Sequence, residues 1–137
     1  MTALLEVTNL RTRFETSEGV VNAVNDVSFQ IKPGETMAIV GESGCGKSVS
    51  MLSILRLLPE PPARIESGAV LFKGSDLCKL HRRALRKITG REIAMIFQDP
   101  MTSLNPVMTI GRQISEGLRT HFGITEAAAR LKASELL

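Results

Sequence analysis

The chain has 137 residues, of which 43% are hydrophobic and 23% charged, and a formal net charge of +3. This is the composition of an ordinary globular domain, and it excludes long-range disorder, collagen-like repeats and coiled-coil bias. The sequence has no apolar stretch near the ~18 residues of a transmembrane helix, no secretory signal, and no disulfide framework or CxxC pair, so we expect a cytosolic domain or a piece of one.

Residues 4–31 are predicted to form β structure. Apolar residues alternate with polar ones from residue 21 onward, with Val24 as the exception, which is the period of a strand with one solvated face. The apolar positions are Val21, Ala23, Val27, Phe29 and Ile31. A Lys-Pro-Gly-Glu turn follows at 32–35. Residues 37–40 (MAIV) are apolar on both faces and predict a strand covered on both sides.

Helices and strands are then expected to alternate. Val49, Leu52, Leu55 and Leu58 recur every third residue and predict a buried helix, which the prolines after it terminate. Residues 69–72 predict a short strand, Ser75 or Asp76 is a candidate helix cap, and a basic helix reaches about Ile88. A second strand is predicted at 93–97, and helices at 109–122 and 125–137.

Positive charge is concentrated between residues 79 and 91, which contain six basic residues and no acid, so the rest of the chain has a net charge of −3. Such a block suits contact with nucleic acid or an anionic membrane. We favour a solvated helix face with its apolar residues inward, and the absence of aromatic residues in the block argues against RNA. The basic residues are Lys79, Arg82, Arg83, Arg86, Lys87 and Arg91, and the apolar ones are Leu80, Ala84, Leu85 and Ile88.

One segment fits the phosphate-binding pattern G-x-x-x-x-G-K-[ST]. Its glycines let backbone N–H groups face a phosphate chain, and the following helix adds its positive N-terminal end. The lysine ammonium is suited to contact the β- and γ-phosphates, and the hydroxyl of the last serine is suited to coordinate Mg²⁺. The alternative for the segment as a whole is a plain glycine-rich turn. Cys45 is interpreted as a small loop residue, with a reactive or metal-binding role as its alternative. The segment is Gly41, Glu42, Ser43, Gly44, Cys45, Gly46, Lys47 and Ser48.

Residues 93–106 (IAMIFQDPMTSLNP) resemble the Q-loop of ABC transporter ATPases. Together with VGESGCGKSVSMLSILRLLP and ESGAVLFKGSDL, they resemble the ATP-binding subunits of oligopeptide, dipeptide and nickel importers. The resemblance implies that Gln98 contacts Mg²⁺ or the attacking water and senses the γ-phosphate. It also places Phe14 where the family has an aromatic that stacks on adenine, although a core phenylalanine of an edge strand is an equal alternative.

The resemblance implies an α/β fold, a P-loop NTPase (ABC ATPase) core with an N-terminal antiparallel β subdomain, stopping within the helical subdomain. Its parts would be residues 1–35, 36–100 and 101–137. A signature segment, an apolar strand ending in Asp-Glu and a switch histidine are not found in the sequence. The aspartates are Asp26, Asp76 and Asp99, and the histidines are His81 and His121.

The expected function is that of an ATP-binding, energy-coupling subunit of a peptide or nickel importer. Its cofactors would be ATP and Mg²⁺, with Ser48 and Gln98 on the metal. Its partners would be permease subunits and a second ATP-binding subunit at the inner face of the membrane, without nucleic acid. Alone, the chain is expected to be poorly soluble, to bind nucleotide weakly and not to turn it over. The alternatives are a soluble P-loop kinase and a non-catalytic nucleotide- or nucleic-acid-binding module.

Overall fold

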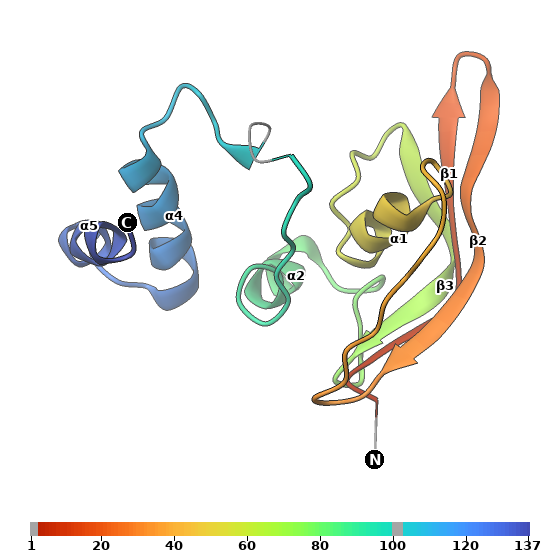
Figure 1. Cartoon of the computed structure of the whole chain (residues 1–137), viewed down its shortest axis with the longest axis horizontal. Helices are drawn as coiled ribbons and strands as arrows, with labels where there is room; N and C mark the ends of the chain where they lie inside the picture. The colour runs from red at the N-terminus through yellow and green to blue at the C-terminus, as the bar shows by residue number, and fades with distance from the viewer. Residues whose placement is uncertain (1–2, 100–102) are drawn as a thin grey trace. The chain divides into compact units, whose positions relative to one another are not determined.

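The computed structural model describes residues 3–99 and 103–137. They belong to two compact units, Met1–His81 and Arg82–Leu137 (Figure 1). Among the described residues, no helix has the length and apolar character needed to cross a bilayer. The predicted boundary between residues 100 and 101 lies outside the described residues.

The first unit is a four-stranded antiparallel sheet with one helix against it (Figure 1). The strands are β1 (Leu5–Thr16), β2 (Gly19–Ile31), β3 (Ala63–Phe72) and β4 (Ser75–Asp76), in the order β2-β1-β3-β4. The β structure predicted for residues 4–31 is confirmed as the β1–β2 hairpin. Ser75 and Asp76 do not cap a helix, because the chain turns back there and pairs with the end of β3.

Three register shifts between β1 and β2 affect which of their side chains face inward, and two of them lie beside residues with positive φ. Asn9 in β1 and Asp26 in β2 both have positive φ, at 47° and 50°, and the strand register shifts beside each of them. Because an extra residue in one strand reverses the alternation beyond it, Val24 turns inward and is only 3% exposed. Val24, the exception in the sequence pattern, is therefore a core residue.

The helix α1 (Lys47–Ile54) is fixed to the central strand by a buried hydrogen bond. The Thr12 hydroxyl donates to Ser53 Oγ at 2.9 Å, and Ser53 Oγ donates to the Val49 carbonyl at 2.7 Å. Thr12 is 1% exposed and Ser53 is fully buried. The buried helix predicted from the leucine spacing is confirmed but ends at Ile54, since Arg56 has a positive φ of 52°.

Replacing Ser53 by alanine is expected to destabilise the chain by about 1–3 kcal/mol, because the buried Thr12 hydroxyl then loses its acceptor. Urea unfolding of the full chain measures the loss. Ser50→Ala is the matched control, since that hydroxyl donates to the carbonyl of Gly46 at the start of the same helix and its loss is expected to be smaller. Equal losses for the two variants would contradict the prediction, and adding Thr12→Val to Ser53→Ala is expected to restore part of the stability.

An ion pair links the two bulged strands at the surface. The Arg11 guanidinium donates to Asp26 Oδ1 at 2.7 Å and also bonds Oδ2, and both side chains are about half exposed. The hydrogen bond from Arg11 holds the pKa of Asp26 below its ordinary value. The carboxylate therefore stabilises the fold at pH values above the unfolded pKa of aspartate, about 3.9, and this contribution is lost as pH falls through the lower folded pKa.

Asp26→Asn is accordingly expected to lower the unfolding free energy slightly at pH 7, with the difference from the parent chain shrinking at acidic pH. Asparagine tolerates the positive φ at this position, so the substitution tests the charge and not the bulge. Unfolding curves measured from about pH 7 down to about pH 3 check the trend. A difference that stays constant over this range would show that the carboxylate charge is not responsible.

The predictions of apolar strands at 37–40 and 93–97 are wrong. Both segments are irregular, apart from one isolated bridge between Thr89 and Ile93. Val40 is 91% exposed and Ile96 is 97% exposed. A strand exists only where a neighbouring strand completes its hydrogen bonds, and no strand of the described chain pairs with either segment. β3, in contrast, begins earlier than the predicted 69–72 because β1 supplies a partner as far as Ala63.

The described part of the second unit includes the helices α2 (Arg82–Ile88), α4 (Ile110–Phe122) and α5 (Glu126–Glu135). The helices predicted at 109–122 and 125–137 are confirmed to within a few residues. Thr109 and Thr125 cap them, each hydroxyl accepting from the backbone N–H three residues later. In α2 the basic side chains are exposed. Of the four apolar residues predicted to face inward, Leu85 is buried, while Leu80, Ala84 and Ile88 are half-buried.

Candidate functional site: a glycine loop at the start of a helix

The glycine-rich segment 41–48 leads from an extended stretch into α1. Gly44 and Gly46 adopt φ values of 81° and 91°, a region that glycine enters without steric penalty. Gly46 is the N-cap of α1, and its carbonyl accepts the first helical hydrogen bond, from Ser50 N at 2.8 Å. The loop therefore places the free N–H groups of the helix at its own opening.

Lys47 folds back over the loop instead of extending into solvent. Its ammonium donates to the carbonyl of Gly41 at 2.6 Å and to the carbonyl of Glu42, and it lies 3.3 Å from Cys45 Sγ. A positive charge thus lies above the same residues whose backbone precedes the helix. Because the helix N-terminus is also electropositive, the ammonium and the helix end attract an anion to one place.

The loop is tightly packed at two points and open elsewhere. A Cβ on Gly41 would lie 2.6 Å from Cys45 Sγ, and a Cβ on Gly46 would lie 2.5 Å from the Ala23 carbonyl oxygen. Residues 41–45 and Ser48 are nevertheless exposed, so a ligand can reach the backbone. The contact with Ala23 ties the loop to β2, and nothing in the residue pattern around position 23 indicates this contact.

The structure places two further predicted site residues, Phe14 and Gln98, on other segments of the chain. Phe14 is half-buried on β1, opposite Val21 and Ala63. β1 is a central strand, so the alternative of an edge-strand phenylalanine is wrong in that detail. Two residues after Thr12, Phe14 lies on the face of the sheet that α1 covers. Gln98 is exposed and belongs to the second unit, and its role stays a prediction. Residues 100–102 of the Q-loop-like segment lie outside the described residues.

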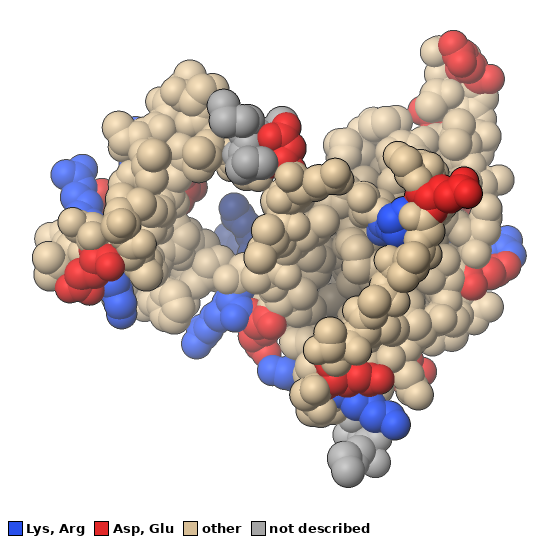
Figure 2. Space-filling view, viewed as in Figure 1, with Lys and Arg blue, Asp and Glu red and all other residues tan. Residues whose placement is uncertain are grey.

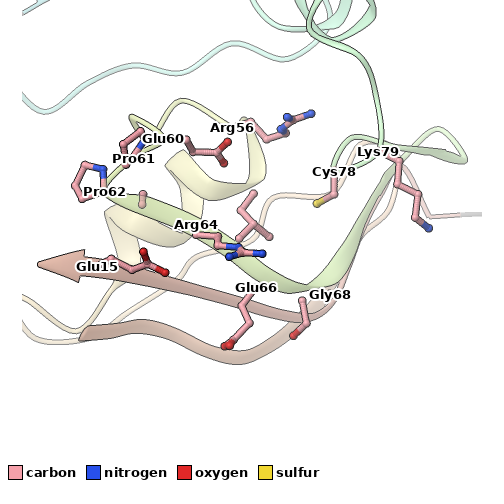
Figure 3. Close-up of a pocket in the computed structure, with 13 residues that line it drawn as sticks. Glu15, Arg56, Glu60, Pro61, Pro62, Arg64, Glu66, Gly68, Cys78 and Lys79 are labelled. Atoms are coloured by element: carbon pink, nitrogen blue, oxygen red, sulfur yellow. The ribbon is translucent and has the colours of Figure 1, made fainter. Parts of the chain in front are cut away.

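A separate hollow of about 580 Å³ lies along β3, and no residue of the 41–48 loop lines it. Figure 3 shows side chains of both charges around it, with Glu15, Arg64 and Glu66 on the strands. Arg56 donates to the Leu80 carbonyl at 2.7 Å, which fixes it at one wall. Burial, with a smaller contribution from Asp76, raises the pKa of the Cys78 thiol, so the thiol stays protonated and unreactive at neutral pH.

A glycine-rich loop at the start of a helix, with a lysine side chain folded over the loop, is the feature that defines the class of P-loop proteins. Comparison with known families is more specific: the description of the ABC transporter family matches residues 24–137. The chain therefore belongs to the ABC transporter family.

The curated relatives agree with this assignment. A probable peptide ABC transporter ATP-binding protein of Sinorhizobium fredii is 53% identical over 134 residues, and a putative peptide import ATP-binding protein of Brucella abortus is 55% identical over 134 residues. The oligopeptide transport ATP-binding protein of Bacillus subtilis is 50% identical over 137 residues. The matches cover 98–100% of this chain but only 38–40% of these relatives. The chain thus spans about 40% of their length.

Solved structures support the fold. A dimeric bacterial ABC transporter cassette matches with a TM-score of 0.74 and 24% identity, and a dimeric ATP-binding cassette in a post-hydrolysis state, bound to ADP and Pi, matches with a TM-score of 0.74 and 25% identity. Each match covers 96% of this chain and 54% of the solved one. The fold predicted from the sequence, an ABC ATPase core with an N-terminal antiparallel β part, is confirmed by these neighbours.

Proposed function

We propose that the chain is the nucleotide-binding part of an ATP-binding subunit of a peptide importer, and that it binds Mg-ATP at residues 41–48. The observation that carries the proposal is the Lys47 ammonium held above the loop by the carbonyls of Gly41 and Glu42. A phosphate chain replaces these carbonyls as the partner of the ammonium, while backbone N–H groups at the start of α1 contact the same phosphates.

Magnesium fits the chemistry of this loop. Among residues 3–99 and 103–137, no three His, Cys, Asp or Glu side chains gather at one place, so the ion would be held by the exposed Ser48 hydroxyl and the phosphates themselves. Mg²⁺ is commonly bound in this way, with few protein ligands and several substrate oxygens. It would neutralise charge on the phosphates, and Gln98 is the second residue proposed to contact it.

The remaining roles follow from the family and not from a contact in this chain. Phe14 is proposed to stack on adenine, and Gln98 to sense the γ-phosphate. The partners are proposed to be permease subunits at the inner face of the membrane and a second ATP-binding subunit. The names of the curated relatives refer to peptides, which supports peptide over nickel as the solute. Family membership argues against a soluble P-loop kinase.

Titration of the folded full chain with Mg-ATP and Mg-ADP in a calorimeter tests the proposal. Both ligands are expected to give a saturable heat, and phosphate release is expected to stay at background, because phosphoryl transfer needs a positioned water and several charged groups together. Absence of heat with both nucleotides would refute nucleotide binding at this loop. Phosphate release that disappears on Lys47→Ala would refute the expectation that the chain does not turn ATP over.

A further inference from the structure

A small hollow of about 190 Å³ lies in the second unit, between α2, the turn after it and the end of α4. We call it the cationic pocket, and it is lined by Arg83, Arg86, Lys87, Arg91, Thr120 and His121. Four of these side chains carry a permanent positive charge, and no Asp or Glu of the described chain is among the lining residues. Figure 2 shows blue side chains around the position of α2, with red side chains beside them.

The walls of this pocket are held in place by local contacts. Gly90 N donates to the Ile93 carbonyl at 2.8 Å, and Glu92 N donates to the Ile88 carbonyl at 2.8 Å, which fixes the turn after α2. A Cβ on Gly90 would lie 2.7 Å from His121 Nε2, so the turn packs directly on the end of α4. These contacts place Thr120 and His121, from the end of α4, beside the basic residues of segment 83–91.

Helix capping does not account for this charge. Arg86 and Lys87 lie in the last turn of α2, where a cation offsets the helix dipole. Arg83 lies in the first turn, where the dipole disfavours a cation, and Arg91 follows the helix end. The like charges of Arg86, Lys87 and Arg91 around one small hollow repel one another, and an anion bound among them would relieve this repulsion.

We propose that the cationic pocket binds a phosphate group, either that of a small anion or that of an anionic lipid headgroup. Guanidinium groups donate bidentate hydrogen bonds to phosphate, and the Thr120 hydroxyl supplies a further donor from α4. The pocket has room for a phosphate, and among its lining residues only His121 has a ring; the sequence has no Trp or Tyr, so the pocket offers little surface for stacking bases. Nucleic acid is therefore disfavoured, and no residue of the 41–48 loop lines the pocket.

The test uses the full chain carrying Lys47→Ala, so that the glycine loop contributes little to phosphate binding. One arm titrates inorganic pyrophosphate, and the other measures co-sedimentation with phosphatidylglycerol/phosphatidylcholine vesicles, both at about 0.05 M salt to limit screening. Arg86→Gln with Lys87→Gln is expected to weaken binding about tenfold in whichever arm binds. Thr120→Ala is expected to weaken it about two- to threefold, because it removes a donor contributed by α4.

Lys32→Gln with Lys132→Gln is the matched control, because it also removes two positive charges but from exposed positions outside the pocket. Its binding affinity is expected to change less than twofold. Pyrophosphate binding alone identifies a free anion, and vesicle binding alone identifies a lipid headgroup. An equal loss in the control pair, absence of binding in both arms, or tighter binding to a DNA duplex that the pocket variant abolishes would each overturn the proposal.

Discussion

Lys47→Ala is expected to lower the affinity for Mg-ATP by about 10- to 100-fold. The ammonium is the only side-chain cation that the structure shows bonded to the loop in its described surroundings, through Gly41, Glu42 and Cys45. A hydrogen bond to a charged group contributes about 1.5–3 kcal/mol, and each 1.4 kcal/mol corresponds to about a tenfold change in affinity. Calorimetric titration of the parent chain and the variant measures the difference directly.

The control for this experiment is Lys32→Ala, which removes an exposed lysine from the turn before the loop. Its affinity for Mg-ATP is expected to stay within about twofold of the parent value, because screened surface charges contribute little. Thermal unfolding of both variants establishes that the fold survives. If Lys47→Ala binds Mg-ATP as tightly as the parent chain while folded, the assignment of residues 41–48 as the phosphate site is wrong.

Gly46→Ala is expected to destabilise the chain and to abolish nucleotide binding together. At a φ of 91° an L-residue costs about 1–2 kcal/mol through its backbone alone. In addition, the new Cβ would lie 2.5 Å from the Ala23 carbonyl oxygen, closer than two non-bonded atoms can approach. Either the loop or β2 must move, and since Gly46 is the N-cap of α1, the N–H groups proposed to contact the phosphates move with it.

Gly44→Ala is the matched variant for this prediction. Gly44 has a similar φ of 81°, but a Cβ there meets no atom within 4 Å. It therefore carries the backbone penalty of about 1–2 kcal/mol without the clash. Urea unfolding is expected to show a larger loss for Gly46→Ala than for Gly44→Ala. Equal losses would show that the contact with β2 is unimportant and that only backbone conformation matters.

Local sequence signals predicted several elements correctly, because their causes lie within a few residues. The helix after the glycine loop follows from leucine spacing, and α4 and α5 begin directly after Thr109 and Thr125, whose hydroxyls cap them. The solvated face of α2 likewise follows from one buried leucine, Leu85, among basic residues. Each of these elements satisfies most of its backbone hydrogen bonds internally, so its own sequence is sufficient.

The wrong predictions share a different cause. Residues 37–40 and 93–97 have the composition of buried strands, yet a strand takes its hydrogen bonds from other strands, and none in the described chain pairs with them. Ser75 and Asp76 have the chemistry of helix caps, but pairing with the end of β3 takes precedence. Val24 breaks the alternation because the bulge at Asp26 reverses it, and a bulge depends on the partner strand.

The sequence alone determined the membership of this chain in a nucleotide-binding family, since eight consecutive residues carry both the glycines that curve the backbone and the lysine that follows them. The sequence alone also showed the concentration of basic residues between positions 79 and 91. The tertiary structure decided what these segments contact: the anchoring of Gly46 against Ala23, the hydrogen bond from Thr12 to Ser53, and the meeting of α2 with the end of α4 at the cationic pocket. These contacts join residues more than 20 positions apart, and only the folded chain sets their distances.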